Sequence, residues 1–439
     1  MADPQSKALQ HVFFAERKAG KIPGLPKDPE LKRIGTVGII GAGTMGGGIS
    51  MNFANAGIPV ALLEMNQEAL DKGLGVIRKN YEASAKKGRM TDAQVEERMA
   101  LLQGTTDYSD LADADLVIEA VFENMDIKKE VFSTLSDTVR PDAILASNTS
   151  YLNIDDIAKV VKNPERMLGM HFFSPANVMR LLEIVRAEKT ASEVLATILK
   201  LAKTIKKVGA VAGVCHGFIG NRMLSGYAHQ ANSLILEGAT PEQVDRVLYE
   251  FGMPMGVIAM ADLAGLDIGY RMRQAMDKSE YDERSAYLYD RLVEMGRLGQ
   301  KTGAGVYDYK PGDRTPIPSP VTKKILEEAA EKFDLKHRDI SDDEVIERCF
   351  YAMVNIGCDI LDEGMAYRAS DIDIVYIYGY GFPAWRGGPM YWAENDIGLE
   401  RLLDRIRAFA KIHGEEHWTP SPLLERLVAD GGSLRDVGA

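Results

Sequence analysis

The sequence predicts an α/β fold, in which a doubly wound sheet is followed by two related all-helical domains. Short runs rich in β-branched residues alternate with helical segments between Leu31 and about Val211, as a sheet with helices on both faces requires. After Val214 the alternation stops and helical periodicity takes over. Within this helical part, residues 222–269 match residues 348–398, which indicates an internal repeat.

These observations divide the chain of 439 residues into four parts. We expect a linker helix and linker over residues 1–30, the doubly wound domain over 31–212, a first helical domain over 213–312 and a second, repeated helical domain over 313–439. The proline-rich loop Pro311–Pro320 marks the boundary between the two helical copies.

The composition is ordinary for a globular protein and argues against some functions. Hydrophobic residues make up 46% and charged residues 26% of the chain, and the net charge is −12. A chain this acidic is a poor general binder of nucleic acid. The three cysteines, Cys215, Cys349 and Cys358, have no metal-ligand spacing, so we expect packed thiols and no metal site.

The sequence carries no recognisable membrane or export signal. No apolar run reaches membrane-spanning length, and the first residues lack a signal-peptide pattern. The C-terminal SLRDVGA is not a peroxisomal address of the S-K-L type. We therefore expect a cytoplasmic protein without membrane insertion.

The individual elements follow from the same patterns. Residues 7–19 form an amphipathic stretch that should pack on the rest of the chain. Its apolar residues are Leu9, Val12, Phe13 and Phe14. Long helical segments are expected at about 67–102 and at 218–236, the latter ended by Glu237-Gly238. Strands are expected at 37–40, 60–64, 116–121, 144–147, 167–173, 181–185 and 210–214.

The stretch between residues 37 and 64 contains a dinucleotide-binding fingerprint. The run Gly41-Ala42-Gly43-Thr44-Met45-Gly46 follows a β-branched strand and opens a small-residue helix, the setting that G-x-G-x-x-G requires. The first glycine allows a tight turn, the second lets the backbone approach a pyrophosphate, and the third lets the helix pack closely on the strand. The N–H groups that open the helix would then face the phosphates. The fingerprint predicts a Rossmann-type domain.

Glu64 indicates which dinucleotide binds. It ends the second predicted strand, where a carboxylate can hold the hydroxyls of the adenosine ribose. The same charge repels the 2′-phosphate of NADP, so NAD is favoured. An FAD site shares the glycine fingerprint, so residues further along must decide between the two cofactors.

Four polar positions lie where predicted strands or helices end. Ser147-Asn148-Thr149-Ser150 closes one strand, His171 closes the next, Glu183 lies on the one after, and Asn221 opens the long helix. Strand ends converge on the ligand crevice of a doubly wound sheet, so we expect these residues to meet. Taken alone, a histidine in an apolar strand is more often a core residue. A neighbouring carboxylate that accepts a hydrogen bond from one ring N–H would leave the other ring nitrogen free to act as a base. Such a base can remove the proton of an alcohol while the alcohol carbon gives hydride to a nicotinamide.

The internal repeat bears on where the site lies. Its shared skeleton pairs Glu237-Gly238 with Glu363-Gly364, Asp245 with Asp373, Gly252 with Gly381 and Asp267 with Asp396. Two such modules can pack face to face. Asn221 precedes the first copy, whereas Glu347 occupies the matching position before the second. If Asn221 is functional, only the first copy works and the second is structural.

Taken together, the motifs resemble those of the L-3-hydroxyacyl-CoA dehydrogenase family, most closely the dehydrogenase part of the multifunctional β-oxidation enzymes. The resemblance extends over essentially the whole sequence and rests on GAGTMGGGI, VIEAVFEN, SNTS, GMHFFSPANVMRLLEI, GFIGNRM and KTGAGVYDY. It implies NAD-linked oxidation of a (3S)-3-hydroxyacyl-CoA to the 3-ketoacyl-CoA in fatty-acid β-oxidation, with NADH used in the reverse direction.

The resemblance also implies roles for individual residues. His171 would be the general base and Glu183 its orienting partner, while Ser150 and Asn221 would hydrogen-bond the substrate or its developing oxygen charge. Lys87 and Ser150 would contact the coenzyme A substrate. With the glycine loop included, the positions expected to contact NAD are Gly41, Ala42, Gly43, Thr44, Met45, Gly46, Glu64, Ala120, Glu123, Lys128, Asn148, Ser174 and Lys301.

Two features depart from the family pattern. Ser174 stands where the single-function members have asparagine, so the contact there should be altered. The multifunctional enzymes carry an enoyl-CoA hydratase domain ahead of the dehydrogenase, whereas this chain starts at the linker helix. We therefore expect a truncated or stand-alone form without the hydratase. The duplicated helical region agrees with the multifunctional type, so we expect a monomer rather than the dimer of single-function relatives.

Two other interpretations stay open from the sequence. The fold could serve as an NAD-binding scaffold without turnover, since a fold alone does not establish activity. Alternatively, the substrate could be a free hydroxy acid or sugar acid. The complete set of His171, Glu183, Ser150 and Asn221 argues against the scaffold, and Lys87 with the acyl-CoA-type motifs argues against the other substrates.

Overall fold

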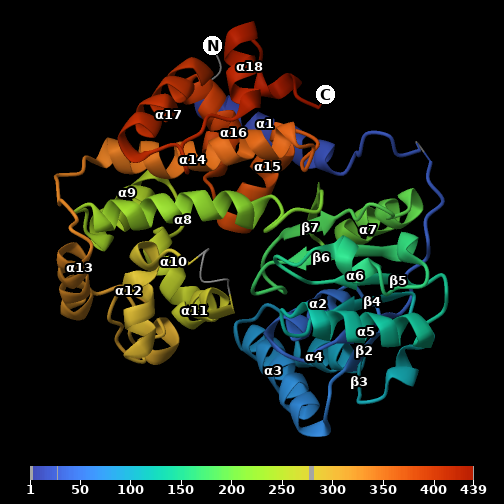
Figure 1. The fold of residues 1–439 in the computed structure, drawn as a ribbon. Helices are drawn as coiled ribbons and strands as arrows, with labels where there is room; N and C mark the ends of the chain where they lie inside the picture. The colour runs from blue at the N-terminus through green and yellow to red at the C-terminus, as the bar shows by residue number, and fades with distance from the viewer. Residues whose placement is uncertain (1–2, 27, 276–280, 439) are drawn as a thin grey trace.

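The structure is a computed structural model that describes residues 3–26, 28–275 and 281–438. It joins an eight-stranded sheet to a larger helical region (Figure 1). The strands are β1 (Val37–Ile40), β2 (Val60–Leu63), β3 (Leu102–Thr105), β4 (Leu116–Glu119), β5 (Ile144–Ser147), β6 (Met167–Phe172), β7 (Leu181–Val185) and β8 (Val208–Ala212). Their order is β3-β2-β1-β4-β5-β6-β7-β8. Strands β1 to β6 run parallel, β7 runs antiparallel to β6, and β8 runs parallel to β7.

Helices cover both faces of this sheet. Successive strand residues point to opposite faces, so Ile39 packs in one hydrophobic core and Ile40 in the other. The first core includes residues of α2 (Thr44–Asn55), α3 (Gln67–Lys86) and α7 (Ser192–Thr204). The second includes residues of α5 (Met125–Thr138) and α6 (Ile154–Ala158) and continues into the helical region. The predicted doubly wound α/β class is therefore confirmed.

The stretch expected to be helical over residues 67–102 contains a strand that the sequence pattern did not predict. Helix α3 ends at Lys86, α4 (Asp92–Met99) begins at a capping box formed by Thr91 and Gln94, and β3 follows. The strand was missed because it lies at the edge of the sheet. Of its four residues only Leu102 is buried, so it lacks the apolar run of an inner strand.

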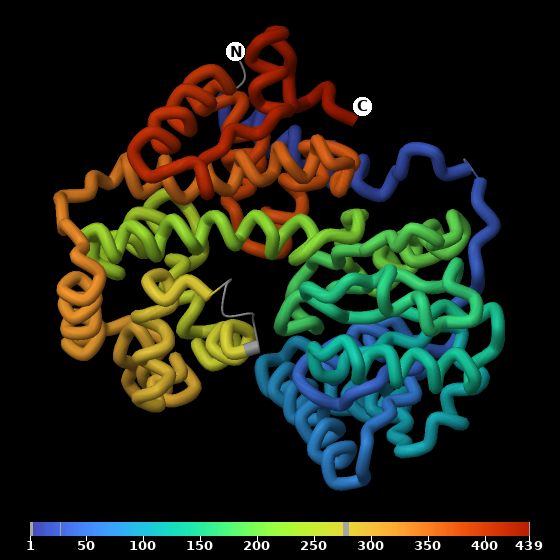
Figure 2. The backbone as a smooth tube through the Cα atoms, in the orientation of Figure 1, coloured from blue at the N-terminus to red at the C-terminus, as the bar shows by residue number. Residues whose placement is uncertain are grey.

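The N-terminal helix α1 (Pro4–Ala19) docks on the second helical copy, and Figures 1 and 2 show it in blue among the orange and red helices. Arg368 donates hydrogen bonds to the carbonyl oxygens of Lys18 and Lys21. The packed face differs from the expected one. The buried residues are Ala8, Val12, Ala15 and Ala19, whereas Leu9, Phe13 and Phe14 are exposed. Small side chains allow the closer helix approach, so they form the contact.

The helical region is built around two long helices, α8 (Gly220–Leu236) and α14 (Asp342–Asp362), which lie against each other (Figure 1). The other helices are α9 (Pro241–Phe251), α10 (Val257–Ala264), α11 (Leu266–Ala275), α12 (Glu283–Glu294), α13 (Pro320–Lys332), α15 (Ala369–Val375), α16 (Pro389–Trp392), α17 (Leu399–His413) and α18 (Pro422–Asp430). Helix α8 agrees with the segment predicted at 218–236. Among the described residues, no helix combines the length and apolar character needed to cross a membrane.

The two helical copies pair reciprocally. Arg222 on α8 forms an ion pair with Glu363 after α14, at 2.5 Å. Arg348 on α14 forms the corresponding pair with Glu237 after α8, at 2.8 Å. Each pair joins an arginine of one copy to a glutamate of the other at matching repeat positions, as an isologous dimer interface would. The repeat therefore folds as two modules that face each other.

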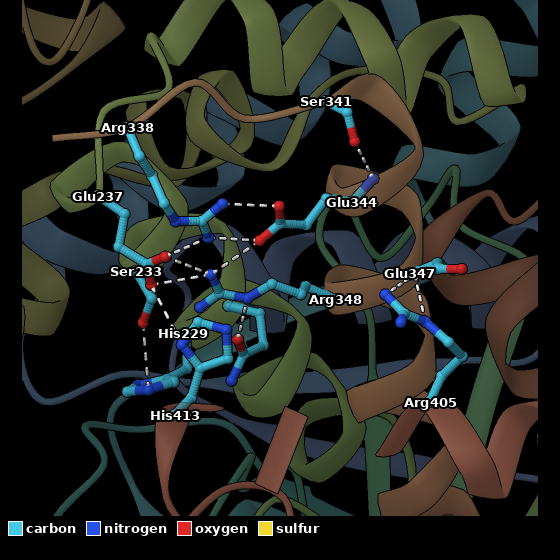
Figure 3. Close-up of polar contacts among 11 residues, drawn as sticks. His229, Ser233, Glu237, Arg338, Ser341, Glu344, Glu347, Arg348, Arg405 and His413 are labelled. Atoms are coloured by element: carbon cyan, nitrogen blue, oxygen red, sulfur yellow. Dashed lines mark hydrogen bonds and ion pairs between the residues drawn. The ribbon is translucent and has the colours of Figure 1, made fainter. Parts of the chain in front are cut away.

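The second of these pairs is part of a polar cluster around the buried Arg348, shown in Figure 3. Arg348 is 1% exposed, and its Nη1 lies 2.8 Å from both carboxylate oxygens of Glu237. Its Nε donates to Gln230 at 3.0 Å. Arg338 bridges the carboxylates of Glu237 and Glu344. The cluster ties α8, α14 and the segment between α13 and α14 together.

The carboxylates of Glu237 and Glu344 lie near His413, and all three side chains are of types that can bind metals. Glu237, Glu344 and His413 place one ligand atom each within a span of 4.8 Å. The guanidinium groups of Arg338 and Arg348 already neutralise both carboxylates. A metal ion would add positive charge to a cluster that holds two cations, so we read these residues as an ion-pair network.

Replacing Arg348 by methionine should lower the free energy of unfolding by about 3–5 kcal/mol, because the mostly buried Glu237 would lose the buried one of its two arginine partners and keep only the exposed Arg338. Chemical denaturation measures this loss. Arg407→Met is the matched control, since Arg407 pairs with Glu425 on an exposed surface and its removal should cost about 1 kcal/mol or less. Equal losses in the two variants would contradict the structural role of the cluster.

Candidate functional site

The glycine loop leaves an open space at the start of α2. Gly41 has a φ of 99°, and a Cβ there would lie 2.8 Å from the carbonyl oxygen of Ala120. A Cβ on Gly46 would lie 1.8 Å from the carbonyl oxygen of Gly41, so only glycine permits this contact. By contrast, no atom lies within 4 Å of a Cβ placed on Gly43. Gly43 is also the N-cap of α2 and offers no side chain to the first N–H groups. The space and its N–H lining fit a dinucleotide pyrophosphate.

Glu64 lies beside this loop. It follows β2 directly, and its Oε2 accepts a hydrogen bond from the Ala42 N–H at 2.8 Å. Its Oε1 accepts from the N–H of Met65. The structure thus brings a carboxylate to the turn that the glycines form, at the carboxyl edge of the sheet where ligands of this fold bind.

A buried charged cluster lies beneath the neighbouring strand ends. Glu119, the last residue of β4, and Lys128 on α5 are both 0% exposed, and their side chains meet at 2.6 Å. The other oxygen of Glu119 accepts from the Ser147 hydroxyl at 2.6 Å. Lys128 also lies 3.6 Å from Glu123. The ammonium group of Lys128 lies between these carboxylates and ties the ends of the strands to α5, and its expected contact with NAD stays a prediction.

Glu123 and Asn148 hold the loop that follows β5. One oxygen of Glu123 accepts from the Thr149 hydroxyl at 2.5 Å and from the N–H groups of Ser150 and Tyr151 at 2.8 and 3.1 Å. The side-chain oxygen of Asn148 accepts from the Phe172 N–H at 2.8 Å, which links the ends of β5 and β6. Both residues therefore set the position of Ser150 relative to the end of β6.

His171 and Glu183 form a buried pair at the centre of the site. The antiparallel register of β6 and β7 places them directly opposite each other. Nδ1 of His171 lies 2.7 Å from Oε2 of Glu183, and the two residues are 4% and 0% exposed. The carboxylate fixes the tautomer with the proton on Nδ1, so that Nε2 is the free nitrogen. The rings of Phe173 and Phe218 lie 4.5 and 5.7 Å from the imidazole and shield it from water.

Glu183 also connects this pair to the helical region. Its second oxygen, Oε1, accepts from the N–H groups of Ile219 and Gly220 at 3.2 and 3.0 Å. These N–H groups open α8, so the carboxylate lies at the positive end of a helix dipole. Asn221 follows immediately in the first turn of α8. The expected pairing of His171 with Glu183 is therefore observed, and Asn221 follows the residue whose N–H binds this carboxylate; among the described contacts, none joins the side chains of Ser150 or Asn221 to the pair.

Three expected residues lie apart from this pair. Ser174 is exposed in the segment after β6, and Lys87 is the exposed C-cap of α3. Lys301 lies in a 3-10 turn of the helical region and forms an ion pair with Asp267. Among the described contacts, none joins these side chains to His171 or Glu183.

The structure adds a residue that the sequence patterns did not identify. Tyr380, from the second helical copy, donates a hydrogen bond to the side-chain oxygen of Asn221 at 2.7 Å. Glu347, which matches Asn221 in the repeat, instead forms an ion pair with Arg405 at 2.6 Å. The aromatic run around Tyr376–Tyr380 was the only available signal, and aromatic residues in a helical region more often indicate core packing.

Family comparisons agree with the two regions of the structure. The NAD-binding domain of 3-hydroxyacyl-CoA dehydrogenase matches residues 36–215. The C-terminal domain of the same family matches twice, over residues 217–309 and 345–438. The double match falls on the two helical copies.

Individual relatives extend over most of the chain. The peroxisomal bifunctional enzyme of Danio rerio is 42% identical over 446 residues, a match that covers 97% of this chain and 61% of that enzyme. The 3-hydroxybutyryl-CoA dehydrogenase of Escherichia coli K12 is 28% identical with a TM-score of 0.78, and the match covers 91% of this chain and 100% of that one. The dehydrogenase part of multifunctional enzyme 1 from C. elegans is 28% identical with a TM-score of 0.69, over 95% of this chain and 96% of that one.

These relatives contradict the expectation of a cytoplasmic protein. Curated relatives from animals and plants are named as peroxisomal or glyoxysomal enzymes. The expectation rested on the lack of recognisable targeting signals, and such a lack does not identify a compartment. The chain spans about 61% of the length of the first of these relatives.

The fold and the sequence matches lead to the same assignment. A glycine loop opens a doubly wound sheet, a buried histidine–glutamate pair lies where β6 and β7 meet, and two helical copies follow. The domain models of one family match nearly all of these elements in the same order. The chain belongs to the 3-hydroxyacyl-CoA dehydrogenase family.

Proposed function

We propose that the protein is an NAD-dependent dehydrogenase that oxidises (3S)-3-hydroxyacyl-CoA thioesters to 3-ketoacyl-CoA thioesters in fatty-acid β-oxidation. The observation that carries this proposal is the buried pair of His171 and Glu183, at 2.7 Å, at the carboxyl end of β6. Family membership supports the substrate class. The names of the multifunctional β-oxidation relatives support the pathway.

In this mechanism His171 is the general base. Its Nε2 takes the proton of the 3-hydroxyl group, while its Nδ1–H remains bonded to Glu183. The charge on Glu183 then offsets the charge of the imidazolium. The N–H groups of Ile219 and Gly220 hold that carboxylate in place. NAD, when bound at the glycine loop, supplies the acceptor for the hydride that leaves C3.

Ser150 and Asn221 are assigned to the reacting end of the substrate. The loop that carries Ser150 is held by Glu123, and Asn221 lies in the first turn of α8 beside the carboxylate of Glu183. A hydroxyl and an amide at these positions would donate hydrogen bonds to the substrate oxygen as negative charge develops on it. The exposed Lys87 is assigned to the phosphates of coenzyme A, as the family resemblance implies.

A cavity beside α8 is suited to the acyl chain. It has a volume of about 530 Å³ and is lined mainly by apolar groups, including Ala228, Val257, Ala261 and Met272. Tyr151, which directly follows Ser150, forms part of the wall. An acyl chain that extends from the reacting carbon into this space would be removed from water, at a gain of about 0.8 kcal/mol for each CH₂ group buried.

We also propose that the chain is a monomer. The reciprocal pairs Arg222–Glu363 and Arg348–Glu237 show that the two copies already cover each other as the halves of a dimer would. Because α8 and α14 already pack against each other within one chain, no second chain is required to cover them.

NADH oxidation with acetoacetyl-CoA and with a long-chain 3-ketoacyl-CoA tests the proposed activity. We expect turnover with at least one of them, and their ratio reports the chain-length preference. In the same assay, His171→Ala should reduce kcat by about 10²- to 10⁴-fold, because the residue that gives the proton to the keto oxygen in this direction is lost.

His337→Ala serves as the control, since His337 is exposed on the helical region away from the pair. Turnover of His171→Ala near the wild-type rate would contradict the role of His171. Binding of NAD without turnover of either substrate by the wild-type protein would favour the scaffold interpretation.

Glu64→Gln should weaken discrimination against NADP by about ten- to a hundredfold in kcat/KM, the range for loss of one charge-assisted contact. Glutamine keeps an acceptor for the Ala42 N–H but carries no charge to repel a 2′-phosphate. Steady-state kinetics with both cofactors measures the change, with Glu68→Gln, in the first turn of α3, as the control. An unchanged NAD preference would remove Glu64 from the ribose site.

A further inference from the structure

The second helical copy reaches into the site of the first. Tyr380 donates a hydrogen bond from its hydroxyl to Oδ1 of Asn221 at 2.7 Å. Its ring also meets Phe173, next to β6, edge-on at 5.4 Å. The two residues that it contacts belong to the first turn of α8 and to the shell around His171. The second copy is thus more than a structural partner.

An extra residue in the second copy creates the turn that carries Tyr380. The second copy has one residue more between Asp373 and Gly381 than the first copy has between Asp245 and Gly252. The chain forms a π-helical turn over Tyr376–Tyr380 at this point, whereas α9 of the first copy is a regular α-helix. A π-turn is the usual result of a one-residue insertion in a helix, and such turns are frequent at functional sites.

The surroundings of Tyr380 hold its ring in one place. The ring stacks on that of Tyr376 at 4.8 Å, and the Tyr376 hydroxyl donates to the carbonyl oxygen of Gly220 at 3.1 Å. A Cβ on Gly220 would lie only 2.5 Å from the Tyr380 ring, so the tyrosine packs directly on the helix backbone. In the first copy, the residue before the matching glycine is Phe251, which has no hydroxyl and packs against Phe350.

We propose that Tyr380 is a positioning residue for the dehydrogenase reaction, an inference that rests on the proposed function. Its hydroxyl occupies the acceptor oxygen of Asn221 and thereby directs the amide –NH₂ toward the substrate. A donor is what the substrate oxygen needs when negative charge develops on it. Burial and the nearby charge of Glu183 raise the pKa of Tyr380 far above its usual value, so the hydroxyl stays protonated and donates at every working pH.

The test compares Tyr380→Phe with Tyr378→Phe, a control in the same π-turn whose hydroxyl bonds to Glu16 on α1. We expect Tyr380→Phe to lower kcat about five- to tenfold, which is the effect of losing one hydrogen bond. Its KM for NAD and its unfolding midpoint should equal those of the Tyr378→Phe control. The double variant Tyr380→Phe/Asn221→Ala should have the kcat of Asn221→Ala alone, because the tyrosine acts through the amide.

Two results would overturn the inference while leaving the proposed function intact. One is a wild-type kcat in Tyr380→Phe, and the other is a full additional loss when Tyr380→Phe is combined with Asn221→Ala. Failure of the wild-type protein to oxidise NADH with any 3-ketoacyl-CoA would overturn both the proposed function and the inference.

Discussion

The hydrogen bonds of the Glu183 carboxylate are the contacts on which the arrangement of the site depends. One oxygen accepts from His171 and the other from the first N–H groups of α8. One side chain thereby sets the imidazole, the start of α8 and the following Asn221 relative to each other. Leaving a buried carboxylate without such donors would cost several kcal/mol of free energy. Moving α8 away from the sheet at this point would therefore be unfavourable. The antiparallel turn from β6 into β7 is what places Glu183 opposite His171.

The two copies of the repeat keep one packing arrangement but differ beside the proposed active site. Reciprocal arginine–glutamate pairs and the contact of α8 with α14 keep the copies face to face. In each copy an aspartate caps the start of a later helix: Asp245 accepts from the N–H of Ile258, and Asp373 accepts from the N–H of Met390. The copies differ at the residues that lie nearest to the His171–Glu183 pair. The first contributes Asn221, while the second has the paired Glu347 at that position and one extra residue in the turn that carries Tyr380.

Local patterns in the sequence predicted the features that depend on short-range order. The alternation of strands and helices, the tight turn at Gly41 and the close packing at Gly46 follow from residue type and spacing. The pairing of His171 with Glu183 was predictable because adjacent strands bring their ends together. Burial and long-range contacts were not predictable in this way. The ion pair of Lys128 with the buried Glu119, for example, joins two elements that no local pattern brings together. Tyr380 reaches its place through a helical irregularity that no periodicity indicates.

In the proposed mechanism His171 and Glu183 act as one unit, with the carboxylate serving only through the imidazole. The most direct measurement is a double-mutant cycle on kcat, with His171→Ala, Glu183→Gln and the double variant. Groups that act as a unit show strongly non-additive losses. We expect the double variant to be no slower than His171→Ala alone. A double variant whose loss equals the product of the two single losses would contradict it.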